Sequence, residues 1–150
     1  MTLLLLALHV LAAVIWVGGM FFAHMFLRPA ASTMELEPRV NLWCNVLSRF
    51  FPWIWGITLV IPLSGYTLLL TLFEPAYASW YIILMQGLGW SMISVFTFTF
   101  FTYYRKMKRM VHRQLIPEAG LYLNRIRNMV SINLILGIGT ILIAVTGRFW

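Results

Sequence analysis

The chain has 150 residues, of which 61% are hydrophobic, 16% aromatic and 10% charged. Soluble domains carry about 25% charged residues, so this composition excludes an ordinary water-soluble domain and indicates an integral membrane protein. The formal net charge of +7 does not indicate a nucleic-acid partner, because nearly all the basic residues gather in two connections that follow apolar segments. The single cysteine, Cys44, excludes an internal disulfide and a cysteine-rich metal site.

The first apolar segment, residues 3–27, carries no formal charge, and about 20 such residues are enough to cross a hydrocarbon core. At about 100° per residue, one face of this helix collects histidine, aromatic and small side chains: His9, Ala13, Trp16, Met20 and His24. The opposite flank is apolar and is expected to face lipid: Leu4, Leu8, Leu11, Ile15 and Phe22. The pattern therefore predicts a membrane helix that packs against other helices of the same chain.

The first span ends at Arg28 and Pro29, since arginine anchors the headgroup region and proline stops a helix. Residues 39–49 then place apolar side chains at helical spacing against polar ones. We expect this segment to be a short amphipathic helix that lies on the membrane surface.

Three further spans are predicted over residues 50–73, 80–104 and 128–147, and Pro62 predicts a kink in the second. The connection over residues 74–79 is short and contains no Lys or Arg. The third span continues into a basic extension, and the fourth helix, from about Glu118 to Thr146, is roughly 40 Å long, which exceeds the thickness of the hydrocarbon core. We therefore expect the third and fourth helices to project together from the membrane as a basic hairpin.

The distribution of Lys and Arg predicts the topology. Three arginines follow the first span (Arg28, Arg39 and Arg49), and seven basic residues lie between Arg105 and Arg127. Connections rich in Lys and Arg stay in the cytoplasm, so both termini are expected on the other side. The predicted fold is an all-α membrane protein of one domain, residues 1–150. It is a four-helix bundle in a bacterial inner membrane, with both termini periplasmic and helices three and four extended into the cytoplasm.

His9 and Met85 are predicted at similar depth, inside the periplasmic ends of spans one and three, and Trp16 shares the face of His9. An imidazole together with a thioether suits haem iron or a soft copper ion. A bis-histidine haem would need its second ligand from another subunit, because no other histidine lies at that depth. The alternative is that His9 hydrogen-bonds across helices while Met85 fills the core, and spacing alone favours it.

A second group of residues is predicted at the cytoplasmic end, where it could form a pocket for an anion or a lipid headgroup. Its members lie on spans one, two and four: His24, Arg28, Arg49, Arg125, Arg127 and Asn133. The alternative is that these arginines act as topology anchors.

Three stretches resemble the small four-helix CopD-like (copper-resistance D domain) membrane proteins of bacteria: LHVLAAVIWVGGMFFAHMFLRPA, RFFPWIWGITLVIPLSGY and RIRNMVSINLILGIGT. The resemblance covers essentially the whole chain. The residues that carry it are His9, Trp16, Gly18, Gly19, Arg28, Pro29, Arg49, Phe50, Gly65, Arg125, Arg127, Asn133 and Gly137. It implies copper handling at the inner membrane.

The first helix also resembles that of HemJ-type protoporphyrinogen oxidases, which implies haem b binding through His9. Those enzymes use a lysine early in the third span, whereas this chain has Ile83, Leu84 and Met85 there and no lysine before Lys106. We expect a protein that binds copper or haem b in the bundle, for copper handling or membrane redox chemistry. A HemJ-like oxidase and an accessory subunit of a respiratory complex are the alternatives, and enzymatic turnover stays open. The expected partners are the lipid bilayer and either a second copy of the chain or a larger membrane complex.

Overall fold

The computed structural model describes residues 1–72 and 79–149, and in this part of the chain the secondary structure is helical throughout. The helices form four continuous helical stretches, which we call rods. The first rod contains α1 (Thr2–Phe22), a π-helical segment η1 (Ala23–Leu27) and α2 (Arg28–Ser32). The second is α3 (Leu36–Leu72). The third contains α4 (Trp80–Phe98), a second π-helical segment η3 (Thr99–Tyr104) and α5 (Arg105–His112), and the fourth is α6 (Ile116–Thr146), followed by the 3₁₀ turn η4 (Gly147–Phe149).

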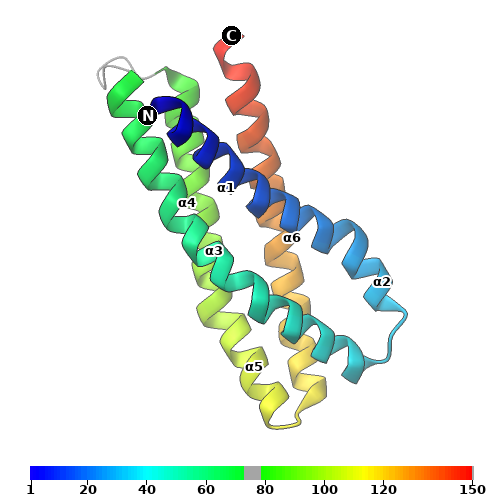
Figure 1. Cartoon of the computed structure of the whole chain (residues 1–150). Helices are drawn as coiled ribbons and strands as arrows, with labels where there is room; N and C mark the ends of the chain where they lie inside the picture. Colours follow the sequence, from blue (N-terminus) through cyan, green and yellow to red (C-terminus); the bar gives the residue numbers. More distant parts are fainter. Residues whose placement is uncertain (73–78, 150) are drawn as a thin grey trace.

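Within the described residues, four helices are long and apolar enough to cross a membrane: Thr2–Ser32, Leu36–Thr71, Trp80–His112 and Ile116–Thr146. This confirms the expected four-span, all-helical class. The two termini lie at the same end of the bundle (Figure 1). On α1, the flank expected to face lipid is exposed, whereas Trp16 and Met20 on the opposite face are buried.

The segment over residues 39–49 is not a separate surface helix, because α3 runs without a break from Leu36 to Leu72. Its apolar stripe is buried against the bundle at Val40, Trp43 and Leu47. Burial of this stripe between helices therefore replaces the expected burial at the lipid surface. The helix also continues through Pro52 and Pro62. Of the expected connection over residues 74–79, residues 74–78 lie outside the described residues, as does the end of the expected span over 50–73.

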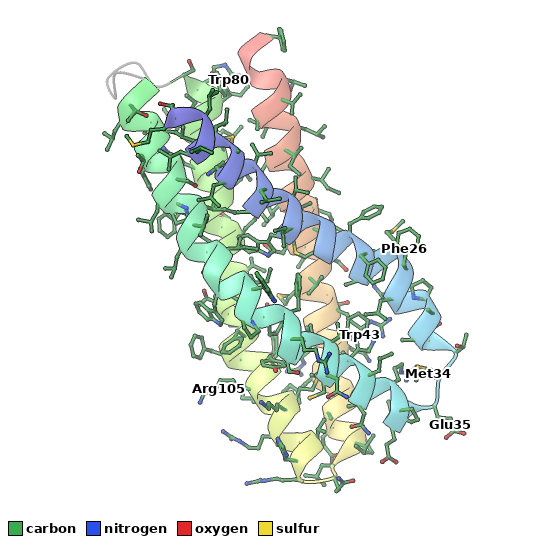
Figure 2. The ribbon with its side chains drawn as sticks, in the orientation of Figure 1. Phe26, Met34, Glu35, Trp43, Trp80 and Arg105 are labelled. Carbon is green, nitrogen blue, oxygen red and sulfur yellow. The ribbon has the colours of Figure 1, made fainter. Side chains whose placement is uncertain are left out.

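α6 contacts each of the other three rods, since it packs against α1, α3, α4 and α5. α1 packs against α3 and α6, α4 packs against α6, and α5 packs against α6 and α3. The third rod continues past residue 104 to His112 before the chain turns into α6. Figure 2 shows the side chains that fill the space between these rods.

Aromatic rings form much of the core. Phe96 of α4 meets Trp16 of α1 at 6.2 Å and Trp55 of α3 at 5.1 Å between ring centroids, both edge to face. Phe51 of α3 meets Tyr104 of η3 at 4.7 Å in the same geometry. Such pairs contribute about 0.5–1.5 kcal/mol beyond their buried area. They tie α1 and α3 to the third rod, where the backbones themselves lie further apart.

Two glycines allow close helix contacts. A Cβ atom at Gly19 would lie 2.6 Å from the ring of Phe50, and one at Gly137 would lie 2.7 Å from Val17. The absence of a side chain thus lets α1 approach α3 and α6, as small residues do in membrane bundles.

The first rod changes its helical geometry at η1. The backbone N–H of Arg28 donates to the carbonyl of Ala23, five residues earlier, so one turn contains an extra residue. His24 lies inside this segment, and η3 makes the corresponding change in the third rod.

Candidate functional site

His9 is a half-buried residue of α1 whose imidazole reaches α3. Its Nδ1 atom lies 3.1 Å from the carbonyl oxygen of Ile61 and 2.9 Å from Oγ of Ser64. Gly65 makes room for the ring, because a Cβ atom there would lie 3.1 Å from Cε1 of His9. Residues 61–65 of α3 thus form the seat of this histidine.

These contacts determine which ring nitrogen of His9 carries the proton. A carbonyl oxygen can only accept, so Nδ1–H donates to Ile61. The hydroxyl of Ser64 donates to the carbonyl of Val60 at 2.6 Å, which leaves its oxygen free to accept from Nδ1 as well. The neutral imidazole then presents a lone pair at Nε2, for which no hydrogen bond is found in the described part of the chain. This is the arrangement in which histidine binds a metal through Nε2 while Nδ1–H is held by a carbonyl.

Met85, the second ligand expected from the sequence, stays a prediction. It is half-buried on α4, and no hydrogen bond joins the two residues in the described part of the chain. The same part contains no group of three or more His, Cys, Asp or Glu side chains that could hold a metal ion. Within the described residues, the site therefore consists of Nε2 of His9, on a ring that is held in place by the hydrogen bond from Nδ1.

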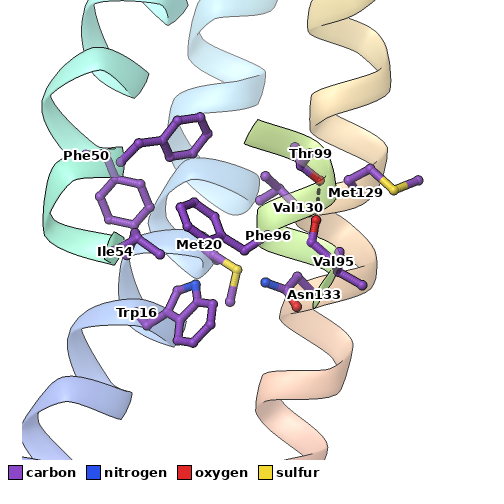
Figure 3. A pocket seen from close by; sticks show the side chains of 11 residues that line it. Trp16, Met20, Phe50, Ile54, Val95, Phe96, Thr99, Met129, Val130 and Asn133 are labelled. Carbon is purple, nitrogen blue, oxygen red and sulfur yellow. Dashed lines mark hydrogen bonds between the residues drawn. The ribbon is translucent and has the colours of Figure 1, made fainter. Parts of the chain in front are cut away.

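Trp16 lies away from this seat, in a small cavity at the centre of the bundle that it shares with Met20 and Asn133 (Figure 3). The cavity has a volume of about 20 Å³, which is room for about one water molecule. Asn133 is 3% exposed, and its Oδ1 atom has no hydrogen-bond partner. The sequence grouped Asn133 with the arginines; the structure places it in this core cavity, where an unpaired acceptor and a water-sized space coincide.

His24 makes a contact of the same kind as His9, but with a different helix. Its Nδ1 atom lies 3.0 Å from Oγ of Ser131 on α6. The hydroxyl of Ser131 also lies 2.9 Å from the carbonyl oxygen of Arg127, so its hydrogen can go to that carbonyl or to Nδ1 of His24. Both histidines of the first rod therefore tie it to a neighbour through a serine.

The arginines near His24 divide into two sets. Arg28 and Arg39 lie close enough to Arg127 for their charges to repel it. Arg49 and Arg125, in contrast, are exposed, and Arg125 stacks over Tyr103 and Tyr122 at 5.7 and 5.9 Å from the ring centroids.

Sequence reasoning left Arg39 out of the site because it lies in the segment expected to rest on the membrane surface. The sequence signal that could have included Arg39 is its spacing of four residues from the buried Trp43, which places both side chains on one face of the helix.

Comparison with known proteins gives no further guide to this site. The chain matches no protein-family model, and no curated protein or solved structure matches it.

Proposed function

We propose that the chain is a CopD-like protein of the bacterial inner membrane in which His9 supplies one protein ligand to a copper ion or to haem b. The observation that carries this proposal is the hydrogen bond from Nδ1 of His9 to the carbonyl of Ile61. It holds the ring in place and leaves the Nε2 lone pair for a ligand. A bound copper ion or haem would supply one-electron chemistry, in copper handling or membrane redox reactions.

The described residues fit one ligand position of such a centre. The cavity beside Trp16 does not include His9, and its volume of about 20 Å³ is far below the roughly 300–1,000 Å³ of sites that enclose small molecules. A haem held by His9 would need its second ligand from another copy of the chain, because no other histidine is predicted at that depth. A copper ion would likewise need further ligands, such as the thioether of Met85 from the same or another copy.

The proposed topology has both termini in the periplasm and the ends of α5 and α6 in the cytoplasm. Its support is that the two basic groups meet: Arg28 and Arg39, which follow the first span, lie close to Arg127 of the second group. Positive charge gathered at one end of a bundle favours that end as cytoplasmic. Within the described residues, no contact favours the HemJ-like oxidase or the accessory-subunit alternative over this proposal.

The test is an absorption spectrum of the detergent-purified protein, oxidised and dithionite-reduced, with metal analysis of the same sample. We expect equimolar haem or copper in the wild type and in His24→Ala, and neither in His9→Ala. His24→Ala is the matched control, because it removes a second histidine of the same rod that also bonds to a serine. Wild-type stoichiometry in His9→Ala would contradict the proposal.

A further inference from the structure

Arg39 lines a groove together with Asn124, to which Arg127 donates a hydrogen bond, and Arg28 is within electrostatic reach of Arg127. Arg28 begins α2, Arg39 lies in the first turn of α3, and Arg127 lies in α6. Arg28 and Arg39 are near enough to repel the charge of Arg127, and no ion pair between these arginines and a carboxylate is present in the described part of the chain. The fold thus holds three like charges together without a counter-charge, which costs free energy unless an anion joins them.

Two N–H donors near these arginines are buried without an acceptor. Nε of Arg127 has no hydrogen-bond partner, and its Nη1 donates at 3.4 Å to Oδ1 of Asn124. Trp43 is 4% exposed, and its Nε1 also lacks a partner. It follows Arg39 by one helical turn on α3. A buried N–H without an acceptor is destabilising, so the unpartnered Nε of Arg127 indicates a missing acceptor at this end of α6.

A groove lies beside this group. It has a volume of about 220 Å³ between the start of α3 and the start of α6. Arg39 and Asn124 provide its polar lining, and the remaining lining residues are apolar or lack a side chain: Leu36, Pro117, Gly120, Leu121 and Leu123. The groove therefore joins a cationic wall to an apolar one.

We propose that Arg28, Arg39 and Arg127, with the adjoining groove, form a binding site for the phosphate of an anionic phospholipid headgroup. A phosphate diester offers acceptor oxygens and no donor, which matches the unpartnered Nε of Arg127. Guanidinium groups bind phosphate in a bidentate manner. The electrostatic reach of Arg127 to Arg28 and Arg39, which lie on separate segments, distinguishes this site from a row of arginines that anchors each helix independently.

The apolar lining selects a lipid over free phosphate. Leu121 is 66% exposed beside the groove, and the helices that form it are long and apolar enough to cross a membrane. An acyl chain can cover such a surface next to the headgroup, whereas inorganic phosphate leaves it in water.

Native mass spectrometry of the full chain, released from detergent with added phosphatidylglycerol or phosphatidylcholine, tests the site. We expect one phosphatidylglycerol retained per chain and little phosphatidylcholine. Arg127→Gln is expected to weaken retention of phosphatidylglycerol about tenfold. Arg125→Gln, two residues away and equally charged but exposed, should change it by less than about twofold.

A second variant guards against a folding defect in Arg127→Gln. Arg28→Gln changes a different helical segment and should also weaken retention, with circular dichroism and size-exclusion chromatography as checks on the fold. Equal losses in Arg125→Gln and Arg127→Gln would overturn the proposal, because they would indicate diffuse attraction to a basic surface. Displacement of the lipid by millimolar inorganic phosphate, with the same dependence on Arg127, would overturn the assignment to a lipid.

Discussion

The two histidines of the first rod make contacts that look alike and differ in one respect. His9 bonds to Ser64 of α3 and also to the carbonyl of Ile61, whereas His24 bonds to Ser131 of α6. A carbonyl can only accept, so it fixes the proton on Nδ1 of His9. A hydroxyl can turn its hydrogen toward either partner, so the proton on His24 depends on the bond from Ser131 to Arg127.

The surroundings of the two histidines differ as well. His9 lies next to Ile61, Ser64 and Gly65, in a stretch without formal charge. His24 lies one turn before Arg28, in the neighbourhood of Arg127. The same pair of residue types thus yields a fixed imidazole orientation in one place and a link beside a cationic surface in the other.

The largest effect is expected from removing the space for His9. Gly65→Val puts a Cβ atom about where Cε1 of His9 needs room, so it should displace the imidazole and lower the free energy of unfolding by about 1–3 kcal/mol. Gly56→Val on the same helix is the control, since a Cβ atom there meets nothing within 4 Å. Thermal unfolding in detergent measures both. Equal shifts of the two melting temperatures would show that the space between Gly65 and the imidazole of His9 can hold a larger side chain.

Removing each imidazole should give the next effect, with a greater loss of unfolding free energy for His9→Ala, which removes two hydrogen-bond contacts, than for His24→Ala, which removes one. Denaturant or thermal titration of the two variants in the same detergent gives the order. A greater loss for His24→Ala would reverse the comparison.

Removing each serine is expected to have a smaller effect on the free energy of unfolding, and it tests directly where each imidazole carries its proton. In Ser64→Ala the carbonyl of Ile61 still accepts from Nδ1, so the proton should stay on Nδ1 of His9. In Ser131→Ala the described hydrogen bond of His24 is lost, so its imidazole should change its proton distribution. Nitrogen-15 NMR of the labelled imidazoles distinguishes the two forms. An altered His9 spectrum in Ser64→Ala would mean that the carbonyl does not fix the proton.

The smallest effect concerns the charges near His24. Arg28→Gln relieves repulsion on Arg127, so lipid-free protein at low salt should gain a few tenths of a kcal/mol at most. The gain should vanish at high ionic strength, which unfolding experiments at two salt concentrations can resolve. The matching change at an exposed site, Arg49→Gln, should leave stability unchanged at both.

Helical periodicity predicted the inward face of α1 correctly. Trp16 and Met20 are buried as expected, and the flank that includes Leu4 and Leu11 is exposed. The partner of each histidine could not be predicted in this way. α1 packs against both α3 and α6, so residues on one stripe meet different helices along its length. Spacing gives the direction of a side chain, while the crossing of the helices determines what it meets.

The segment over residues 39–49 shows a second limit. An apolar stripe such as Val40, Trp43 and Leu47 has the same spacing whether it faces a lipid surface or another helix. Contacts of α3 with α5 and α6 decide the matter, and they bury the stripe. For this reason Arg39, which lines the groove, and the buried Trp43 lie in a region where the sequence predicted a surface helix.

The π-helical turns η1 and η3 bear on which changes of chain length the protein can accept. Each contains one residue more than an α-helical turn, so loss of one residue from Ala23–Leu27 or Thr99–Tyr104 can convert it to an ordinary turn. Both flanking helices would then keep their present faces toward the bundle. A single deletion elsewhere in α1 or α4 would instead rotate everything beyond it by about 100° and turn buried side chains outward. These two short segments are therefore where insertions and deletions of one residue are expected to be tolerated.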